Sequence, residues 1–130
     1  MQRVSTISTN NAPQAIGPYS QGKIFGDLIF ASGQIALMAN GEFVNGDINA
    51  QTRQVLENLK AVLESAESNL DSVIKTTIFL TDIDDFAVVN KIYASYFGEN
   101  KPARSTIAVK ELPKGAKVEI ECIALKKSAF

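Results

Sequence analysis

Apolar side chains recur every three or four residues between positions 48 and 66, the clearest periodic pattern in the chain. This spacing is typical of one face of an α-helix, because it brings successive side chains to the same side. The positions that share the pattern are Ile48, Thr52, Val55, Leu56, Leu59, Val62, Leu63 and Ala66. Asp47 stands directly before them, where its carboxylate can cap the first turn. The pattern predicts a helix that begins after Asp47 and covers a core with one face.

A second helix is predicted from about Asp84 to Phe97. The side chains expected on its buried side are Phe86, Val89, Tyr93 and Phe97. Asp82 or Asp84 can cap its first turn, and Gly98 can end it, because glycine readily adopts the left-handed conformation of a helix end.

Five stretches rich in β-branched and apolar residues predict strands. They are residues 21–25, 28–32, 73–81, 104–109 and 117–125. Gly26-Asp27 predicts a hairpin turn between the first two. The region before the first helix also holds a proline-containing loop at 12–20 and a turn at Asn40-Gly41, followed by Phe43-Val44. The predicted order of elements is βββαβαββ, an α+β sandwich.

Two helices can cover only one face of this sheet, so the composition of the other face matters. Alternation along strand 73–81 separates Ile74, Thr76, Ile78 and Leu80 from Val73, Lys75, Thr77, Phe79 and Thr81. Along strand 117–125 it separates Val118, Ile120 and Cys122 from Lys117, Glu119, Glu121, Ile123 and Leu125. Each second set mixes charged with large apolar side chains, and an exposed apolar patch usually marks an interface. We therefore expect a closed homo-oligomer with a pocket at the seam between subunits.

Length and composition limit the classes of protein to which the chain can belong. The 130 residues, 45% hydrophobic and 21% charged, predict a single globular domain over 1–130. A net charge of −1 argues against a general nucleic-acid binder. No apolar run approaches the roughly 20 residues that cross a bilayer, and residues 1–6 lack the apolar core of a secretory signal. We therefore expect a cytoplasmic protein with no nucleic-acid or membrane partner.

The chain contains no histidine and one cysteine, which removes most familiar catalytic machinery. Cys122 alone cannot form an internal disulfide or a cysteine-rich metal site, and we expect it to be a buried apolar residue. Arg104, at the start of strand 104–109, can hold a carboxylate or phosphate through two parallel hydrogen bonds. Glu119 and Glu121 follow on the next strand. This combination favours a small anionic substrate.

Five short segments are spread over nearly the whole chain. They are Ile16-Gly17-Pro18-Tyr19-Ser20-Gln21, Ala31-Ser32-Gly33-Gln34-Ile35, Asp85-Phe86-Ala87-Val88-Val89-Asn90, Pro102-Ala103-Arg104-Ser105 and Val118-Glu119-Ile120-Glu121. Each alone carries little information. Together and in this order they resemble the Rid family, also called YjgF or L-PSP. The similarity is greatest to its RidA branch, the enamine/imine deaminases.

The resemblance implies a chorismate-mutase-like fold that forms a homotrimer, with three pockets in clefts between subunits. It also implies hydrolysis of reactive enamines and imines, chiefly 2-aminoacrylate and 2-iminobutyrate, to 2-keto acids and ammonia. Neither a metal nor an organic cofactor is expected.

The family pattern also implies a set of site residues. They are Arg104, Glu119, Tyr19, Ser32, Gly33, Asn90 and Thr106. Arg104 would bind the substrate carboxylate, and Glu119, directly or through a water, would pass a proton to the departing nitrogen. Thr106 stands where the family often has cysteine. The backbone carbonyl there is thought to hold the attacking water, so threonine should be tolerated, whereas a role for the thiol itself is put in doubt.

Each of these residues also has a purely structural interpretation. Arg104 could form a structural ion pair, and Glu119 could be a solvated strand residue paired with a lysine. Tyr19 could pack on the domain from its loop, and Ser32-Gly33 could simply end a strand. Asn90 could hydrogen-bond at a subunit interface. Glu121 is interpreted as structural.

Two functions remain open from the sequence. Imine hydrolysis needs orientation of a small acid, one water and a proton shuttle, which arginine and glutamate can supply without histidine. The alternative is a regulatory or protein-binding module that senses a small carboxylic acid in the same cleft. Family members are also named translation inhibitors, endoribonucleases and regulators. Nuclease activity is disfavoured here, because the chain lacks histidine and a basic aromatic surface.

Overall fold

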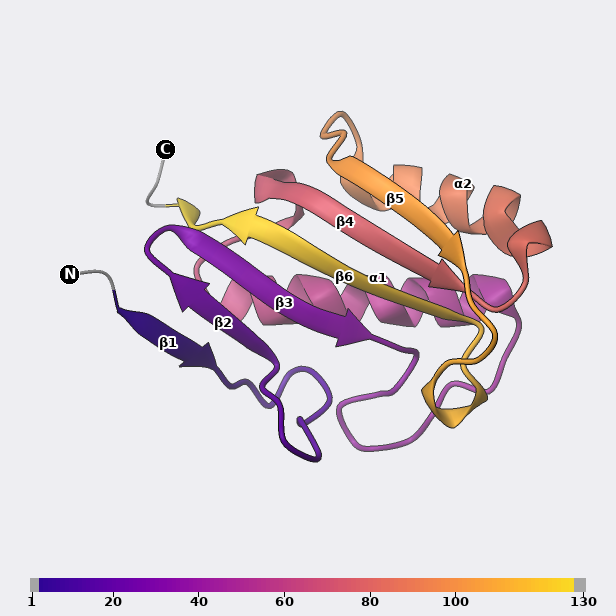
Figure 1. Ribbon diagram of the computed structural model, residues 1–130, viewed down its shortest axis with the longest axis horizontal. Helices are drawn as coiled ribbons and strands as arrows, with labels where there is room; N and C mark the ends of the chain where they lie inside the picture. Colours follow the sequence, from indigo (N-terminus) through magenta and orange to yellow (C-terminus); the bar gives the residue numbers. More distant parts are fainter. Residues whose placement is uncertain (1–2, 128–130) are drawn as a thin grey trace.

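Six β-strands form one sheet in the computed structural model, which describes residues 3–127 (Figure 1). They are β1 (Val4–Ile7), β2 (Gly22–Phe25), β3 (Leu28–Gln34), β4 (Val73–Leu80), β5 (Ala103–Ala108) and β6 (Val118–Leu125). Their order across the sheet is β1-β2-β3-β6-β4-β5. Neighbours are antiparallel except β4 and β5, which are parallel because the chain crosses between them through a helix.

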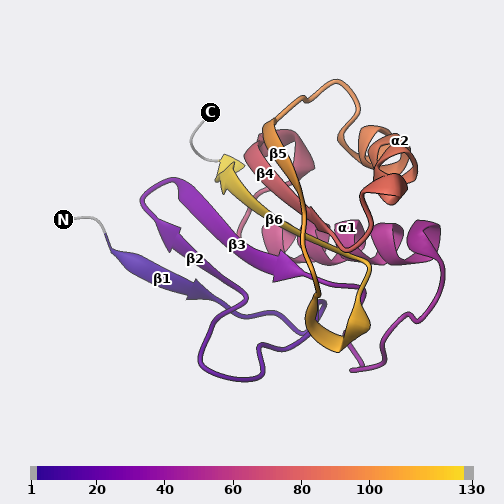
Figure 2. The same cartoon turned by 45° about the vertical axis from the view of Figure 1, so that its right-hand side comes forward.

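Two α-helices, α1 (Ile48–Ser65) and α2 (Phe86–Phe97), pack on the same face of the sheet (Figures 1 and 2). Short 3-10 turns add η1 (Leu70–Ser72), η2 (Ile83–Asp85) and η3 (Pro113–Gly115). Asp47 caps α1 as predicted, since its side chain accepts a hydrogen bond of 2.9 Å from the backbone N–H of Ala50. Gly98 ends α2 with a φ of 61°, in the left-handed region. The predicted α+β class is confirmed.

The core lies between the helices and the sheet. Its largest fully buried apolar side chains are Ile29, Leu56, Leu59, Leu63, Ile78, Leu80 and Ile120. Burial of each such side chain stabilises the fold by about 1.5–3 kcal/mol before the entropy of ordering is counted. Cys122 is buried among them, as predicted. The predicted face of α2 is confirmed for Val89, Tyr93 and Phe97, whereas Phe86 is only partly buried.

The N-terminal strand and the start of α2 differ from the prediction. The predicted order requires three strands before α1, but the sequence located only two of them. The third is β1, at the N-terminal end of the sheet. It is an edge strand with three of its four residues exposed, so it has no apolar alternation. Phe43 forms only an isolated bridge with Leu37. α2 begins at Phe86 because Asp82 caps the preceding η2 turn, accepting a hydrogen bond of 2.9 Å from the N–H of Asp84.

The predicted alternation of β4 is wrong at its first two residues. Val73 is buried and Ile74 is 43% exposed, the reverse of the expectation. The pairing register with β6 shifts between Val73 and Lys75, and such an irregularity turns the side chains that precede it to the other face. From Thr76 onward the prediction holds, and Thr76, Ile78 and Leu80 are all buried.

The sheet face opposite the helices carries both charged and apolar side chains, as the sequence indicates. Partly or fully exposed members of this face on β3, β4 and β6 are Phe30, Lys75, Thr77, Phe79, Glu119, Glu121, Ile123 and Leu125. Phe30 is 43% exposed, and it pairs with Ile123 across the β3–β6 ladder. Separately, no helix within residues 3–127 is both long enough and apolar enough to span a bilayer.

Candidate functional site

Arg104 lies on the edge strand β5, and its side chain reaches toward α2. Its backbone is in register with Thr76 on β4, whose side chain also faces the helices. The Nη1 group of Arg104 donates a hydrogen bond of 2.8 Å to Oδ1 of Asn90. The guanidinium carbon lies 5.4 Å from the centre of the Phe86 ring and 5.0 Å from that of Tyr93. Positions 86, 90 and 93 share one helical face, so one side of α2 holds the guanidinium.

A cleft of about 410 Å³ opens beside this arginine, between α2 and the start of β5. Its lining residues are Asn90, Tyr93, Ala94, Phe97, Gly98, Asn100, Lys101, Pro102 and Arg104. The lining contains two cations, Arg104 and Lys101, and no carboxylate. An anion entering this cleft would therefore meet attraction without a competing negative charge. We call it the arginine cleft.

Glu119 lies on β6 and faces the opposite side of the sheet. Its neighbours in the strand, Val118 and Ile120, are fully buried under the helices, so Glu119 points to the open face. Its carboxylate packs against Gly33, where a β-carbon would overlap Oε2 and come within 2.8 Å of Cδ of Glu119. A side chain at position 33 would therefore displace the flexible end of Glu119 from its place against β3. Gly33 therefore does not end a strand, because β3 continues to Gln34 across a register shift.

The pKa of the Glu119 carboxyl is raised, first by its partial burial and then by the negative charge of Glu121. Both effects disfavour the ionised form. A glutamate with a raised pKa can carry a proton closer to neutral pH than an ordinary surface carboxyl can. This property is compatible with the proton-transfer role that the sequence predicts for Glu119.

A second cleft, of about 520 Å³, surrounds Glu119, and we call it the glutamate cleft. Its lining residues are Pro13, Gln14, Ile16, Tyr19, Gln21, Ser32, Gly33, Gln34, Ile35, Leu37, Pro113, Lys114 and Glu119. The Ser32 hydroxyl donates a hydrogen bond of 2.6 Å to the carbonyl of Ser20, and its N–H donates to the carbonyl of Gln21 at 3.0 Å. These bonds attach the loop that carries Tyr19 to β3. Tyr19 itself is 56% exposed.

The predicted site residues thus divide between two separate clefts of the single chain. Arg104 and Asn90 line the arginine cleft, and Tyr19, Ser32, Gly33 and Glu119 line the glutamate cleft. Arg104 is in register with Thr76 near the start of β4, whereas Glu119 pairs with Phe79 near its end, on the other face. Thr106 follows Arg104 on the helix-facing side of β5 and is partly buried. The predicted residues do not form one pocket within one chain.

Comparison with known proteins places this sequence and fold in a family. The family model described as Endoribonuclease L-PSP matches residues 9–126, which is nearly the whole chain. A crystal structure of YyfA from Yersinia pestis, described as a member of the conserved Rid protein family, is 53% identical, with a TM-score of 0.92 over 95% of this chain and 99% of that one. The chain belongs to the Rid (L-PSP) family.

Relatives of this Rid protein carry different functional names. A protein of Salmonella typhimurium named 2-iminobutanoate/2-iminopropanoate deaminase is 46% identical, over 94% of this chain and 98% of its own length. A protein of Lactococcus lactis named putative regulator AldR is 52% identical, over 94% of this chain and 98% of its own. Both relatives match this chain over nearly its whole length. One is named as an enzyme and the other as a regulator.

Two residues of this Rid protein that the sequence predicts only as core also contact a candidate site residue. Phe86 and Tyr93 were assigned to the apolar stripe of α2, and both also pack against the guanidinium of Arg104. The available signal was the spacing of positions 86, 90 and 93, which puts both rings beside the predicted site residue Asn90. Gln21 directly precedes β2 and also has a structural role that its sequence context did not indicate. Its buried amide binds the backbone of the loop before it, accepting from Thr9 N–H and donating to the Pro13 carbonyl, both at 2.7 Å.

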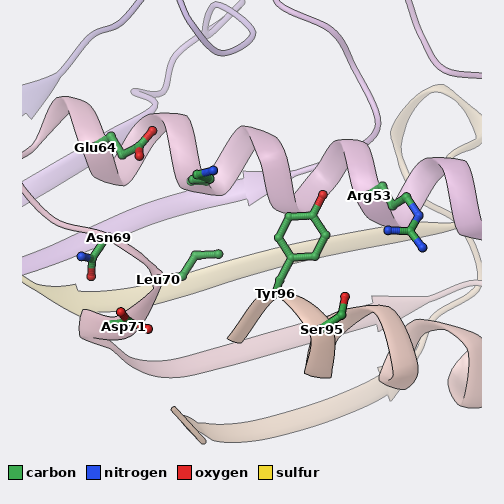
Figure 3. Close-up of a pocket in the computed structure, with 8 residues that line it drawn as sticks. Arg53, Glu64, Asn69, Leu70, Asp71, Ser95 and Tyr96 are labelled. Carbon is green, nitrogen blue, oxygen red and sulfur yellow. The ribbon is translucent and has the colours of Figure 1, made fainter. Parts of the chain in front are cut away.

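A third cleft of this Rid protein, of about 380 Å³, lies on the outer side of the helices (Figure 3). Its lining residues are Arg53, Lys60, Glu64, Asn69, Leu70, Asp71, Ser95 and Tyr96. Two cations and two carboxylates share the lining, so it favours neither charge. Burial, followed by the nearby Glu57, raises the pKa of the Tyr96 phenol to about 12. No predicted site residue lies here, and no three His, Cys, Asp or Glu side chains within residues 3–127 are grouped to hold a metal ion.

Proposed function

We propose that this Rid protein hydrolyses small 2-imino and 2-enamino acids to 2-keto acids and ammonia, with Arg104 as the clamp for the substrate carboxylate. The observation that carries the proposal is the arginine cleft, where α2 holds a guanidinium beside a lining without carboxylates. The deaminase name of the Salmonella typhimurium relative supports the same reaction.

The arrangement of Arg104 suits recognition of a carboxylate. Asn90 accepts one hydrogen bond from Nη1, which leaves the other guanidinium N–H groups to form two parallel bonds with an anion. The ring faces of Phe86 and Tyr93 contact the cation without neutralising its charge. A substrate acid bound in this way has its imine carbon held at a fixed distance from the clamp, and such orientation lowers the barrier to water addition.

The reaction needs one water and a proton transfer. A 2-enamino acid first takes up a proton at its β-carbon and becomes the protonated imine. Water then adds to the carbon of the protonated C=N group and loses a proton, which gives a neutral tetrahedral amino alcohol. The nitrogen takes a further proton, the C–N bond breaks, and ammonia leaves as the C=O bond forms. We propose that Glu119 delivers this proton, directly or through a water, and its raised pKa supports the role. In the proposed mechanism the backbone carbonyl at Thr106 orients the water, so the step requires no thiol.

We further propose that the active protein is a homotrimer in which the arginine cleft of one copy adjoins the glutamate cleft of the next. Within one chain the two clefts share no lining residue, so a substrate bound at Arg104 would have no carboxyl group of the protein beside it to transfer the proton. The exposed Phe30 on the open sheet face supports burial of that face against another copy. The substrate would then be the only small-molecule partner that the site requires.

The lifetime of 2-iminobutyrate tests the proposal directly. A threonine dehydratase generates the imine, and its loss is followed with and without the protein. We expect faster loss with wild type and a fall of at least about 100-fold in kcat/KM for Arg104→Ala, because a charge-assisted bidentate contact is removed.

Arg53→Ala is the matched control, since Arg53 lies in the third cleft, and it should leave the rate unchanged. Unaltered turnover in folded Arg104→Ala would refute the clamp. No acceleration by folded wild type would refute the deaminase and favour a module that senses a carboxylic acid without converting it.

A further inference from the structure

Arg104 depends on α2 for its orientation. It is an exposed residue on an edge strand, and a free arginine side chain there would sample many rotamers. The Asn90 hydrogen bond fixes one nitrogen, and the two aromatic rings fix the plane of the guanidinium. Of these three contacts only Tyr93 is itself buried, with 6% of its surface exposed, so its ring has the most firmly defined position.

The Tyr93 ring is fixed from two further sides. Its hydroxyl hydrogen-bonds to Oγ1 of Thr76 at 2.7 Å in the buried layer between α2 and the sheet. Its ring stacks on Phe97, with centroids 4.3 Å apart and planes inclined by 29°. Thr76 is the residue of β4 that pairs with Arg104 of β5. Three contacts therefore form a closed circuit: Arg104 pairs with Thr76 through the strands, Thr76 bonds to the Tyr93 hydroxyl, and the Tyr93 ring contacts the guanidinium of Arg104.

This circuit has a physical consequence for the clamp. Strand pairing sets the distance between the Thr76 and Arg104 backbones, and the Thr76–Tyr93 bond sets the height of the ring above the sheet. The guanidinium rests on that ring, so its plane follows from two backbone-defined positions. Burial raises the pKa of the Tyr93 phenol above its ordinary value, so the hydroxyl remains protonated across the neutral range and can keep this bond.

We propose that Tyr93 is a positioning residue for carboxylate recognition, because its Thr76-anchored ring sets the plane in which Arg104 presents its two N–H groups. The inference rests on the proposed function in one respect, namely that Arg104 binds a carboxylate. Tyr93 also lines the arginine cleft, but its hydroxyl is bonded to Thr76, and in this proposal it acts on the substrate through Arg104. Its removal should therefore weaken binding and raise KM, while the proton transfer assigned to Glu119 continues at nearly the same kcat.

The test measures binding and turnover separately. 2-Oxobutyrate, a stable 2-keto acid, is titrated into each protein by calorimetry, and KM and kcat are measured with 2-iminobutyrate. For Tyr93→Leu we expect Kd and KM to rise by about tenfold, as loss of a partly desolvated cation–π contact predicts, with kcat within about threefold of wild type. Tyr93→Phe keeps the ring between Phe97 and Arg104 but removes the hydroxyl that binds Thr76, so it should raise Kd by less than Tyr93→Leu does, about threefold.

Two further variants keep the proposal falsifiable. Ile92→Ala removes a buried side chain from the same helix without touching Arg104, and it should leave Kd unchanged even if the protein is less stable. If Tyr93→Leu does not fold, Tyr93→Phe decides together with Phe86→Leu, because Phe86 is only partly buried and its ring contacts the same guanidinium. It should raise Kd by about threefold.

An unchanged Kd in folded Tyr93→Leu, or in both Tyr93→Phe and Phe86→Leu where Tyr93→Leu does not fold, would overturn the positioning role. An equal loss in Ile92→Ala would also overturn it, by assigning the effect to stability. Wild type that binds 2-oxobutyrate without accelerating imine loss would refute the deaminase alone, and the Kd series would still test Tyr93. Wild type that accelerates imine loss without measurable 2-oxobutyrate binding would leave KM as the test of Tyr93, and wild type that does neither would overturn both proposals.

Discussion

At the scale of single residues, Glu119 and Gly33 act as a pair. The carboxylate occupies the space that a β-carbon at position 33 would fill, which keeps Glu119 against β3 and partly away from water. Partial burial and the charge of Glu121 then raise its pKa. The close approach that Gly33 permits therefore also contributes to the perturbed protonation of the glutamate.

A raised carboxyl pKa has a defined effect on stability. The folded state binds the Glu119 proton more tightly than the unfolded state does. Ionisation of this carboxyl therefore lowers the stability of the fold, and the loss is complete once pH has risen above the folded-state pKa. Glu119→Gln removes this penalty. We therefore expect the variant to melt on the order of 2 °C higher than wild type at pH 7. The difference should disappear near pH 4 as the carboxyl becomes protonated in both states.

The same variant should lose turnover. Glutamine cannot transfer a proton, so we expect kcat for 2-iminobutyrate to fall by roughly 100-fold with little change in KM. Thermal melts at several pH values and steady-state kinetics check both effects on one sample. A variant that melts below wild type at pH 7 would contradict the raised pKa, and one with normal kcat would contradict the proton-transfer role.

At the scale of elements, α1 holds the loops that border the glutamate cleft. Asn58 is buried on α1, and its Nδ2 donates hydrogen bonds to the carbonyls of Ile35 at 3.1 Å and Leu37 at 2.7 Å. Ile35 and Leu37 both line the glutamate cleft. Gln51 acts similarly at the helix start, where its Oε1 accepts from the Lys117 N–H at 2.9 Å. Polar side chains of α1 thus position segments far apart in the sequence.

Replacing Asn58 should therefore affect both stability and the cleft. Asn58→Ala leaves two carbonyls without their donor, and we expect a loss of about 2 kcal/mol in the free energy of unfolding. Denaturant titration measures it. Lys60→Ala, an exposed change on the same helix, should stay within about 0.5 kcal/mol of wild type. Equal stability of Asn58→Ala and Lys60→Ala would show that water replaces the lost donor.

At the scale of the whole molecule, the open face of the sheet is the surface that we propose forms the contact between copies. Phe30 lies on this face beside Ile123 and is 43% exposed in the single chain. Phe30→Glu should convert the proposed trimer to single chains, because a buried unpaired carboxylate at an interface is unfavourable. Light scattering after size-exclusion chromatography measures the mass, and imine hydrolysis should be lost together with the trimer.

Ile83→Glu is the matched control, since Ile83 is 51% exposed but lies in the η2 turn outside the sheet. It should leave the mass and the turnover unchanged. Wild type that is already a single chain at working concentration and yet hydrolyses 2-iminobutyrate would contradict the shared site. A Phe30→Glu protein that remains a trimer would show that the open face is not the contact.

The sequence by itself determined the elements and the chemistry available to this protein. The apolar period and Asp47 defined α1, and β-branched runs located five of the six strands, because these signals depend only on neighbouring residues. The absence of histidine and the presence of Arg104 and Glu119 limited the chemistry in the same way. The five motifs sufficed to indicate the Rid family.

Tertiary structure alone decided which residues meet. The register shift after Val73 reversed two side chains of β4, and the edge strand β1 formed without an apolar pattern because it gains its hydrogen bonds from β2. Sheet order and register placed Arg104 and Glu119 on opposite faces, in separate clefts, and set Tyr93 beneath the guanidinium. These relations join residues distant in the chain through packing and backbone pairing, which local sequence patterns do not encode.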